Sequence, residues 1–260
     1  MSEAHLSLRG VCKSFVTPDG DRHGVLRDLS LDITPGEFVC ILGASGSGKT
    51  TLIRALAGLE SIDQGEIRHG GRRPGAGFVF QRDALLPWRT VLENVVFGLE
   101  MQGMPRAERE VRGRELLALV GLAHVGKHYP SALSGGMRQR VNLARALAVD
   151  RDLLLMDEPF SALDAQTREI MQRELLAIWA QHRKTVLFIT HQIDEAIYLA
   201  DRIIVLGSAG QGIRADLRVD DPRPRDLALK RAPHFIALAE HLWSLLEADV
   251  VAAIHQERQA

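Results

Sequence analysis

The chain has 260 residues, and 46% of them are hydrophobic, which is enough for one large packed domain or two small ones. A chain that is disordered throughout is therefore excluded. With 32 basic and 33 acidic residues the formal net charge is -1, so nothing in the charge favours nucleic acid as the main partner.

Two further features suggest a reducing compartment and no membrane span of the chain's own. Cys12 and Cys40 are too few for a disulfide framework and lack metal-ligand spacing. No basic segment followed by an apolar stretch opens the chain, and no run approaches 18 apolar residues. We therefore expect a cytoplasmic protein whose work at a membrane passes through a partner chain.

The N-terminal part predicts strands. Residues 5–16 and 26–33 contain alternating apolar and polar positions, which is typical of half-buried strands in an antiparallel sheet. Pro18, Asp19 and Gly20 predict the turn between them.

A glycine-rich segment follows the short apolar run at 38–42. Residues 43–50 read Gly-Ala-Ser-Gly-Ser-Gly-Lys-Thr, which fits the phosphate-loop pattern, and residues 51–59 can continue as a helix. Glycines let the backbone curl its N–H groups around a phosphate, and the helix start adds unpaired amides. Lys49 would reach the terminal phosphates and the Thr50 hydroxyl would bind Mg²⁺. A chance glycine-rich turn, expected in about one chain in a hundred of this size, is the weaker interpretation.

The next segments alternate between turns, strands and helices. Asp63-Gln64-Gly65 predicts a turn before a strand at 66–68, and glycines and a proline predict a loop through Gly77. Phe78-Val79-Phe80 predicts a buried strand with Gln81 at its end. Thr90 and Glu93 form a capping box, and a second helix is expected near Pro105. The all-helical block at roughly 85–140 is interpreted as an inserted subdomain.

Leu-Ser-Gly-Gly-Met at 133–137 precedes another predicted helix. Ser134 is a plausible N-cap, and the two glycines let an anion approach the backbone closely. An ordinary helix cap explains the same residues, so the segment alone does not decide its function.

An apolar run at 153–156, typical of a central parallel strand, ends in Asp157 and Glu158. In a chain with a phosphate loop, Asp157 would hold Mg²⁺ through water, and Glu158 would orient or deprotonate the attacking water. The alternative is a pair of acids that cap the next helix. Because ligands bind outside the carboxyl ends of parallel strands, the functional interpretation is favoured.

The remaining segments continue the α/β pattern. Asp164 is a candidate N-cap of the next helix. A buried strand at 186–190 ends in His191, where the ring would donate a hydrogen bond to a terminal phosphate oxygen. One more strand is expected at 203–206, and the amphipathic helix near the end is expected to pack on its own domain.

The order of these motifs resembles the ATP-binding cassette family over about residues 5–210. The segment at 80–88 and Asp-Pro-Arg-Pro-Arg at 221–225 look like the ATPase subunit of nitrate, taurine and aliphatic sulfonate importers. The resemblance implies a single α/β domain over residues 1–260, a phosphate-loop NTPase with a mainly parallel sheet and an antiparallel β subdomain. Its parts would be a nucleotide-binding core (1–84 and 150–215), a helical subdomain (85–149) and a C-terminal helical tail (216–260).

The resemblance also implies two cassettes, identical or paralogous, that dimerise head to tail around two ATP molecules. Each ATP would lie on one chain's phosphate loop, covered by Ser134, Gly135 and Gly136 of the other chain. Gln81 would sense Mg²⁺ and the attacking water beside the permease groove, and Asp164 would couple the two sites. The implied nucleotide contacts are Phe15, which stacks on adenine, and Gly43, Ala44, Ser45, Gly46, Ser47, Gly48, Lys49, Thr50 and Thr51.

The catalytic residues that the resemblance implies are Glu158, His191, Gln81 and Lys49. The Mg²⁺ contacts that it implies are Thr50, Gln81 and Asp157. The expected place of action is the cytoplasmic face of the inner membrane, with permease subunits and, indirectly, an external solute-binding protein as partners. Three positions depart from the common family pattern: Phe15, Met137 and Gln192. A different importer, a non-transport cassette ATPase acting on DNA or ribosomes, and a small-molecule kinase are the alternatives.

Overall fold

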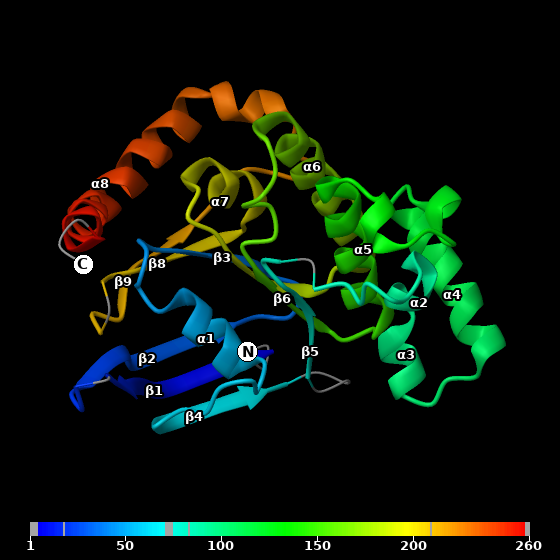
Figure 1. Cartoon of the computed structure of the whole chain (residues 1–260). Helices are drawn as coiled ribbons and strands as arrows, with labels where there is room; N and C mark the ends of the chain where they lie inside the picture. The colour runs from blue at the N-terminus through cyan, green and yellow to red at the C-terminus, as the bar shows by residue number, and fades with distance from the viewer. Residues whose placement is uncertain (1–4, 18, 71–74, 83, 209, 258–260) are drawn as a thin grey trace. The chain divides into compact units, whose positions relative to one another are not determined.

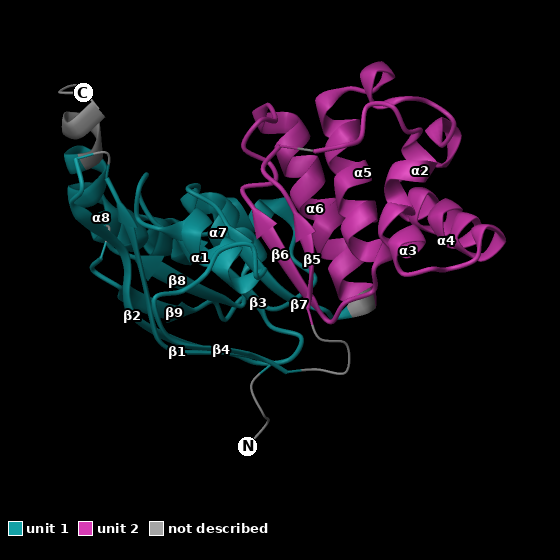
Figure 2. Cartoon of the chain, turned by 60° about the horizontal axis from the view of Figure 1, so that its bottom comes forward, with its two compact units in different colours: residues 1–74, 183–260 teal, residues 75–182 magenta. Residues whose placement is uncertain are grey.

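A computed structural model describes residues 5–17, 19–70, 75–82, 84–208 and 210–257. The chain divides into two compact units, one made of residues 1–74 and 183–260 and the other of residues 75–182 (Figure 2). Across the described residues, every helix is too short or too polar to span a bilayer.

The first unit begins with an antiparallel sheet. Strands β1 (Leu6–Val16), β2 (Arg22–Ile33) and β4 (Gln64–His69) pair in the order β2-β1-β4, shown in blue and cyan in Figure 1. Leu29, Leu31 and Ile33 are buried while the residues between them are exposed, so the alternation in the sequence is the inside-outside pattern of β2. The predicted antiparallel layer is confirmed.

The same unit holds three parallel strands and one antiparallel edge strand. Strand β3 (Phe38–Leu42) pairs in parallel with β7 (Thr185–Ile189) on one side and β8 (Arg202–Leu206) on the other, and β9 (Ile213–Arg218) runs antiparallel to β8. Every residue of β3 and β7 is buried, which explains their unbroken apolar sequences. Helix α1 (Lys49–Leu56) contacts both β2 and β7.

Two further helices cover the parallel strands of this unit. Helix α7 (Ile193–Leu199) contacts β3 and the C-terminal helix α8 (Pro233–Glu257), which also contacts β8. The short helical turn η3 (Leu227–Arg231) lies against both helices. Phe235, Leu242 and Leu246 are buried, so α8 packs on its own unit as predicted.

Arg225 holds the end of α7 in place. Its guanidinium is buried and donates to the carbonyl oxygens of Ile197, Tyr198 and Ala200 at 2.8–3.1 Å, which are acceptors that the helix end leaves without helical partners. Burial is the main cause that lowers the pKa of Arg225. The Asp-Pro-Arg-Pro-Arg segment therefore serves a structural purpose, as a clamp on α7.

The second unit contains the parallel pair β5 (Ala76–Val79) and β6 (Leu153–Asp157) with five α-helices. These are α2 (Val91–Val95), α3 (Phe97–Met101), α4 (Arg106–Leu119), α5 (Gly135–Ala148) and α6 (Ala165–His182), joined in part by the helical turns η1 (Ala123–Val125) and η2 (Pro130–Ala132). Helix α5 contacts α2, α3, α4 and β5, and it is the central helix of the unit.

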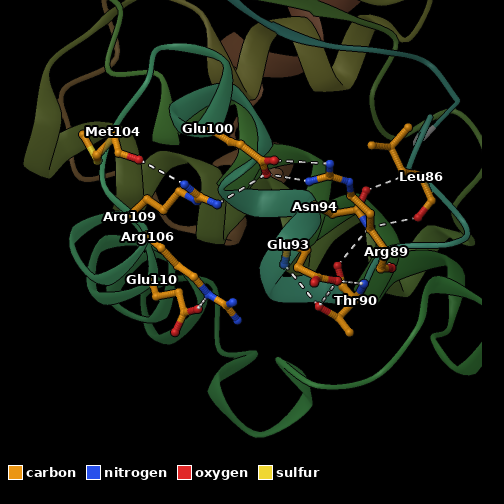
Figure 3. A network of polar contacts seen from close by, with 10 residues as sticks. All are labelled: Leu86, Arg89, Thr90, Glu93, Asn94, Glu100, Met104, Arg106, Arg109 and Glu110. Carbon is orange, nitrogen blue, oxygen red and sulfur yellow. Dashed lines mark hydrogen bonds and ion pairs between the residues drawn. The ribbon is translucent and has the colours of Figure 1, made fainter.

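A polar network organises the start of the helical region (Figure 3). Thr90 and Glu93 form the predicted capping box, with the Glu93 carboxylate 2.7 Å from the Thr90 backbone nitrogen. Asn94 is fully buried, and its amide donates to the carbonyls of Leu86, Arg89 and Thr90 at 3.0–3.1 Å while its oxygen accepts from the Leu86 N–H at 2.7 Å. One side chain thus fixes the loop before α2.

Three local predictions were wrong. Strand β5 ends at Val79, so Phe80 lies outside it and is 39% exposed. Gly77 belongs to β5, where it pairs with Leu154, and not to the preceding loop. A glycine is needed at this position because a Cβ would lie 2.6 Å from the Ala146 carbonyl oxygen of α5. Strand β4 begins at Gln64, so Gln64 and Gly65 lie in the strand and not in the turn predicted before it. The helix expected near Pro105 is confirmed, since α4 begins directly after this residue.

Candidate functional site

The phosphate loop joins β3 to α1 as the sequence predicts. Gly46 and Gly48 have φ angles of 76° and 91°, in the left-handed region where a side chain is disfavoured. Gly48 is the N-cap of α1, so the first amides of the helix face the loop. The local backbone therefore has the form that binds an anion at a helix start.

The loop glycines differ in what surrounds them. A Cβ on Gly43 would collide with Ser47 Oγ, and one on Gly48 would lie 2.9 Å from the Val25 carbonyl oxygen. At Gly46 a Cβ would meet nothing within 4 Å. Gly43 and Gly48 are thus required by packing within the protein, whereas Gly46 borders open space where a ligand can approach.

Two buried polar side chains lie in the loop. Lys49 is 6% exposed, and its ammonium donates to the carbonyl oxygens of Gly43 and Ala44 at 2.8 Å each. Ser47 is 4% exposed, and its hydroxyl is one of two buried side-chain polar atoms in the described residues with no hydrogen-bond partner. A buried cation beside an unsatisfied donor suits a phosphate group, since burial without a partner is otherwise costly.

The other side chains of the loop differ in exposure. Ser45 and Thr50 are exposed, Ala44 is buried and Thr51 is half-buried. The Thr50 hydroxyl is a hard oxygen donor of the kind that Mg²⁺ prefers.

Phe15, the predicted adenine platform, lies near the end of β1 and is 41% exposed. The Lys13 ammonium lies 5.0 Å from the centre of its ring, within the range of a cation–π contact. Lys13 is itself buried and pairs with Glu60 at 2.7 Å. The ring is therefore supported by a fixed cation and still has exposed surface for a ligand.

His191 comes two residues after the last residue of β7 and is exposed. Thr190, between them, is buried and its hydroxyl oxygen accepts from the backbone N–H of Gln192 at 3.0 Å. Helix α7 begins at Ile193, directly after Gln192. The histidine is thus placed at the carboxyl end of a parallel strand, as predicted.

In the second unit, Asp157 and Glu158 stand at the carboxyl end of β6. Asp157 is 7% exposed and is the last residue of the strand. Glu158 is half-buried and has a φ of 43°, a strained conformation for a residue with a side chain. Its carbonyl oxygen accepts from the backbone N–H and the hydroxyl of Ser161, at 3.2 and 3.0 Å. These two hydrogen bonds stabilise the turn that positions the Glu158 carboxylate.

Gln81 and Glu158 are brought together although 77 residues separate them. The Gln81 amide donates to Glu158 Oε2 at 3.3 Å. The two residues follow β5 and β6, which are adjacent parallel strands, so their side chains meet at one edge of the pair. In such a pair the amide can orient a water molecule, and the carboxylate can accept a proton from that water.

Ser134 is the N-cap of α5, and its hydroxyl oxygen accepts from the Met137 backbone N–H at 3.3 Å. A Cβ on Gly135 would meet nothing within 4 Å, while one on Gly136 would press on Thr167 at 3.1 Å. The helix start is therefore open at Ser134 and Gly135, where an anion on another molecule can approach.

Asp164 is the N-cap of α6. Its carboxylate accepts from the Thr167 backbone N–H at 3.0 Å, and this bond is the main cause that lowers the pKa of Asp164. The N-cap prediction is confirmed, and a role for Asp164 between two chains stays a prediction.

The predicted residues therefore fall into two groups, one in each unit. Phe15, the phosphate loop and His191 belong to the first unit, and Gln81, Ser134–Gly136 and Asp157–Glu158 to the second. Within the described residues, no group of three or more His, Cys, Asp or Glu side chains gathers as metal ligands. The sequence reasoning missed Lys13, and it missed Gln139 and Asn142, whose only signal is that two amides stand three residues apart on α5.

Comparison with known proteins identifies relatives over most of the chain. The family model described as "ABC transporter" matches residues 26–161. A taurine import ATP-binding protein from Pseudomonas aeruginosa is 49% identical over 225 residues, covering 85% of each chain. A nitrate import ATP-binding protein from Synechocystis is 43% identical over 255 residues, covering 93% of this chain and 95% of the relative.

A solved structure is also similar to this chain. A dimeric structure of an ATP-binding cassette in a post-hydrolysis state, bound to ADP and Pi, matches with a TM-score of 0.74 and 33% sequence identity. The match covers 84% of this chain and all of that cassette.

Proposed function

The chain belongs to the ABC transporter family, and we propose that it binds and hydrolyses ATP to energise an importer for nitrate, taurine or a similar small solute. Aliphatic sulfonates are also included among these solutes, since one relative is named an aliphatic sulfonates import ATP-binding protein. The observation that carries the hydrolytic part is the contact of Gln81 with Glu158 directly after the buried strand β6.

ATP binding is assigned to the first unit. The phosphate loop, residues 43–51, would hold the triphosphate through its backbone amides and the Lys49 ammonium. The unpartnered hydroxyl of Ser47 supports this assignment, because a bound phosphate oxygen would satisfy it. Phe15 would stack on the adenine, and its exposed ring with Lys13 behind it supports that role.

We also propose that a Mg²⁺ ion is held with the nucleotide. Thr50, Gln81 and Asp157 would supply oxygen donors, which are the ligands that Mg²⁺ takes. When bound, the ion would neutralise charge on the phosphates.

Hydrolysis is assigned to residues at strand ends. A water oxygen bonds to the γ-phosphorus, the bond from phosphorus to the β,γ-bridging oxygen breaks, and a water proton passes to the Glu158 carboxylate. Gln81 orients that water by hydrogen bonding. His191 and Lys49 stabilise the charge that develops on the γ-phosphate oxygens.

We further propose that two copies, or this chain and a paralogous cassette, form a head-to-tail dimer around two ATP molecules. The open start of α5 at Ser134 and Gly135 supports this arrangement, since it offers amides and a hydroxyl to a phosphate on a second chain. The dimeric cassette with ADP and Pi is consistent with it. Asp164 would transmit the state of one site to the other.

The relatives are named import ATP-binding proteins, which supports partner chains that carry a solute across a membrane. We propose that permease subunits hold this chain at the cytoplasmic face of the inner membrane, and that an external solute-binding protein delivers the solute. Closing of the dimer on ATP would move the permease subunits, and hydrolysis would release them. Solute choice would then lie in those partners.

The Glu158→Gln variant tests the hydrolytic assignment. The amide keeps the size of the side chain and cannot accept the proton, so ATP should bind with unchanged affinity while hydrolysis is almost abolished. With ATP present, the variant should elute as a stable dimer in size-exclusion chromatography. Turnover at the wild-type rate would remove Glu158 from the mechanism.

A second experiment addresses the solute. A strain in which the gene is deleted should fail to grow on at least one of taurine, an alkanesulfonate or nitrate as sole sulfur or nitrogen source, and the intact gene should restore growth. Normal growth on all three would indicate a different importer. Phosphorylation of an acceptor in place of phosphate release would instead favour a kinase.

A further inference from the structure

Helix α5 carries a row of polar side chains that the proposed mechanism does not use. Gln139, Asn142 and Arg145 are spaced by three residues, which places them along one side of the helix. Asn142 is fully buried and Gln139 is 6% exposed. Buried amides are costly unless they are hydrogen-bonded, so their partners indicate why they are there.

The three side chains are bonded to one another in sequence. The Asn142 amide donates to Gln139 Oε1 at 3.1 Å, and the Arg145 guanidinium donates to Asn142 Oδ1 at 3.0 Å. These bonds fix the orientation of each amide, because a flipped Asn142 would face Arg145 with a donor. The row therefore acts as one unit.

Each member of the row also holds a backbone carbonyl outside α5. Gln139 donates to Pro159, the residue after Glu158. Asn142 donates to Phe80, the residue before Gln81, at 3.1 Å, and Arg145 donates to Ala84 at 2.8 Å. The row is thus hydrogen-bonded both to the segment that carries Gln81 and to the segment that carries Glu158.

The backbone is strained in both of the segments to which the row is hydrogen-bonded. Glu158 and Ala84 have φ angles of 43° and 45°, a conformation that residues with a Cβ adopt only when their surroundings hold them. The bonds from α5 are at or next to these two residues. An apolar row on α5 would remove these three donors and leave the strained turns without that support.

We infer that Gln139, Asn142 and Arg145 are positioning residues, which hold Gln81 and Glu158 at hydrogen-bonding distance and tie both to the helix that begins after Ser134. The inference rests on the proposed hydrolysis of ATP and goes beyond it by assigning a support for the two water-facing side chains. Because the bonds described above run to neither the phosphate loop nor the start of α5, we expect loss of the row to leave ATP binding and dimer closure intact.

The test compares Asn142→Leu with Asn94→Leu in the full-length chain. Both asparagines are fully buried in the same unit and donate to backbone carbonyls, so both variants lose stability. For Asn142→Leu we expect kcat for ATP hydrolysis to fall at least tenfold with KM changed less than twofold. For Asn94→Leu we expect both constants to stay within twofold of the wild type.

A readout without turnover accompanies the kinetics. In the Glu158→Gln background, Asn142→Leu should still give the ATP-dependent dimer, and hydrogen exchange of residues 78–86 should be faster than in the Asn94→Leu protein. An equal loss of kcat in the two variants, or an unchanged kcat in Asn142→Leu, would overturn the inference. If Asn142→Leu does not fold, Arg145→Met gives the same comparison at a less buried position.

The two proposals fail in different ways. A wild-type protein that binds no ATP or releases no phosphate contradicts the proposed function itself. A wild-type protein that hydrolyses ATP, with Asn142→Leu and Arg145→Met at wild-type kcat, contradicts only the positioning role.

Discussion

Replacing the Asn94 side chain by that of aspartate tests how far one buried amide stabilises the second unit. The Asn94→Asp substitution keeps the oxygen that accepts from the Leu86 N–H but replaces the nitrogen that donates to the carbonyls of Leu86, Arg89 and Thr90 (Figure 3). A carboxylate oxygen would then face three carbonyl oxygens at about the distances of the present hydrogen bonds.

The magnitude follows from the burial of this residue. The carbonyls of Leu86 and Thr90 also accept from the backbone N–H groups of Arg89 and Asn94, at 3.1 and 2.9 Å, so they keep a partner in the variant. The larger cost is the uncompensated buried charge, which is about 3–5 kcal/mol. Since the variant can relax and admit water, we expect the free energy of unfolding to fall by about 3–5 kcal/mol at pH 8. This is a large part of the stability of a typical domain.

The loss should depend on pH in a defined direction. Burial and the facing carbonyls would raise the pKa of the introduced carboxyl in the folded state, so the penalty is full above that pKa and shrinks as pH falls toward about 4. A rise of about two units corresponds to about 3 kcal/mol. Urea unfolding followed by circular dichroism at pH 5 and pH 8 measures it, with Asn94→Leu as the uncharged reference.

The reasoning would be refuted by a loss below about 1 kcal/mol at pH 8. It would equally be refuted if the aspartate and leucine variants responded to pH in the same way, since only the introduced carboxyl adds a group that titrates in this range.

Three further predictions concern the nucleotide site and a helix cap. Phe15→Ala should weaken ATP binding about 5- to 150-fold in calorimetry, as expected for about 1–3 kcal/mol of base stacking, with tripolyphosphate binding unchanged; equal ATP affinity would contradict the platform. Ser47→Ala should weaken ATP binding about tenfold or more without loss of thermal stability, because its hydroxyl has no partner to lose in the protein; a destabilised variant that binds ATP normally would contradict this. Glu93 has its pKa lowered, chiefly by the Thr90 backbone N–H, so its stabilisation is present above the ordinary glutamate pKa and is lost as pH falls below about 4. Glu93→Gln should therefore lose less stability between pH 7 and pH 3 than the wild type, and identical losses in urea unfolding would contradict the cap.

The parts of the fold that the sequence predicts correctly are those with strong local requirements. The phosphate loop needs glycine at positions such as Gly48, where φ is positive and Val25 lies close. The loop can therefore be recognised in the sequence by its glycines. The strand β6 is apolar because both its faces are buried, and it ends in acids where the chain leaves the core. Capping residues such as Thr90 and Ser134 also act over a few residues.

The features that the sequence does not predict depend on where distant segments meet. The edge strand β9 was not predicted, because its alternating half-buried and exposed residues include charges that are also common in loops. Helix α7 has only seven residues and is stabilised by Arg225, which is 26 residues beyond its end. The row on α5 is not predicted for the same reason, because its amides bind the carbonyls of Phe80 and Pro159, which are distant in the sequence.

The central claim is that each ATP is hydrolysed by the phosphate loop of one chain and Ser134 of another. The direct test mixes purified Lys49→Ala and Ser134→Ala proteins, each of which is expected to be nearly inactive alone. In a head-to-tail dimer of the two variants, one site carries both defects and the other carries neither. Random pairing should therefore restore phosphate release to about a quarter of the wild-type rate per chain. If each chain used its own Ser134, no intact site would form, and a mixture no more active than the average of its components would contradict the claim.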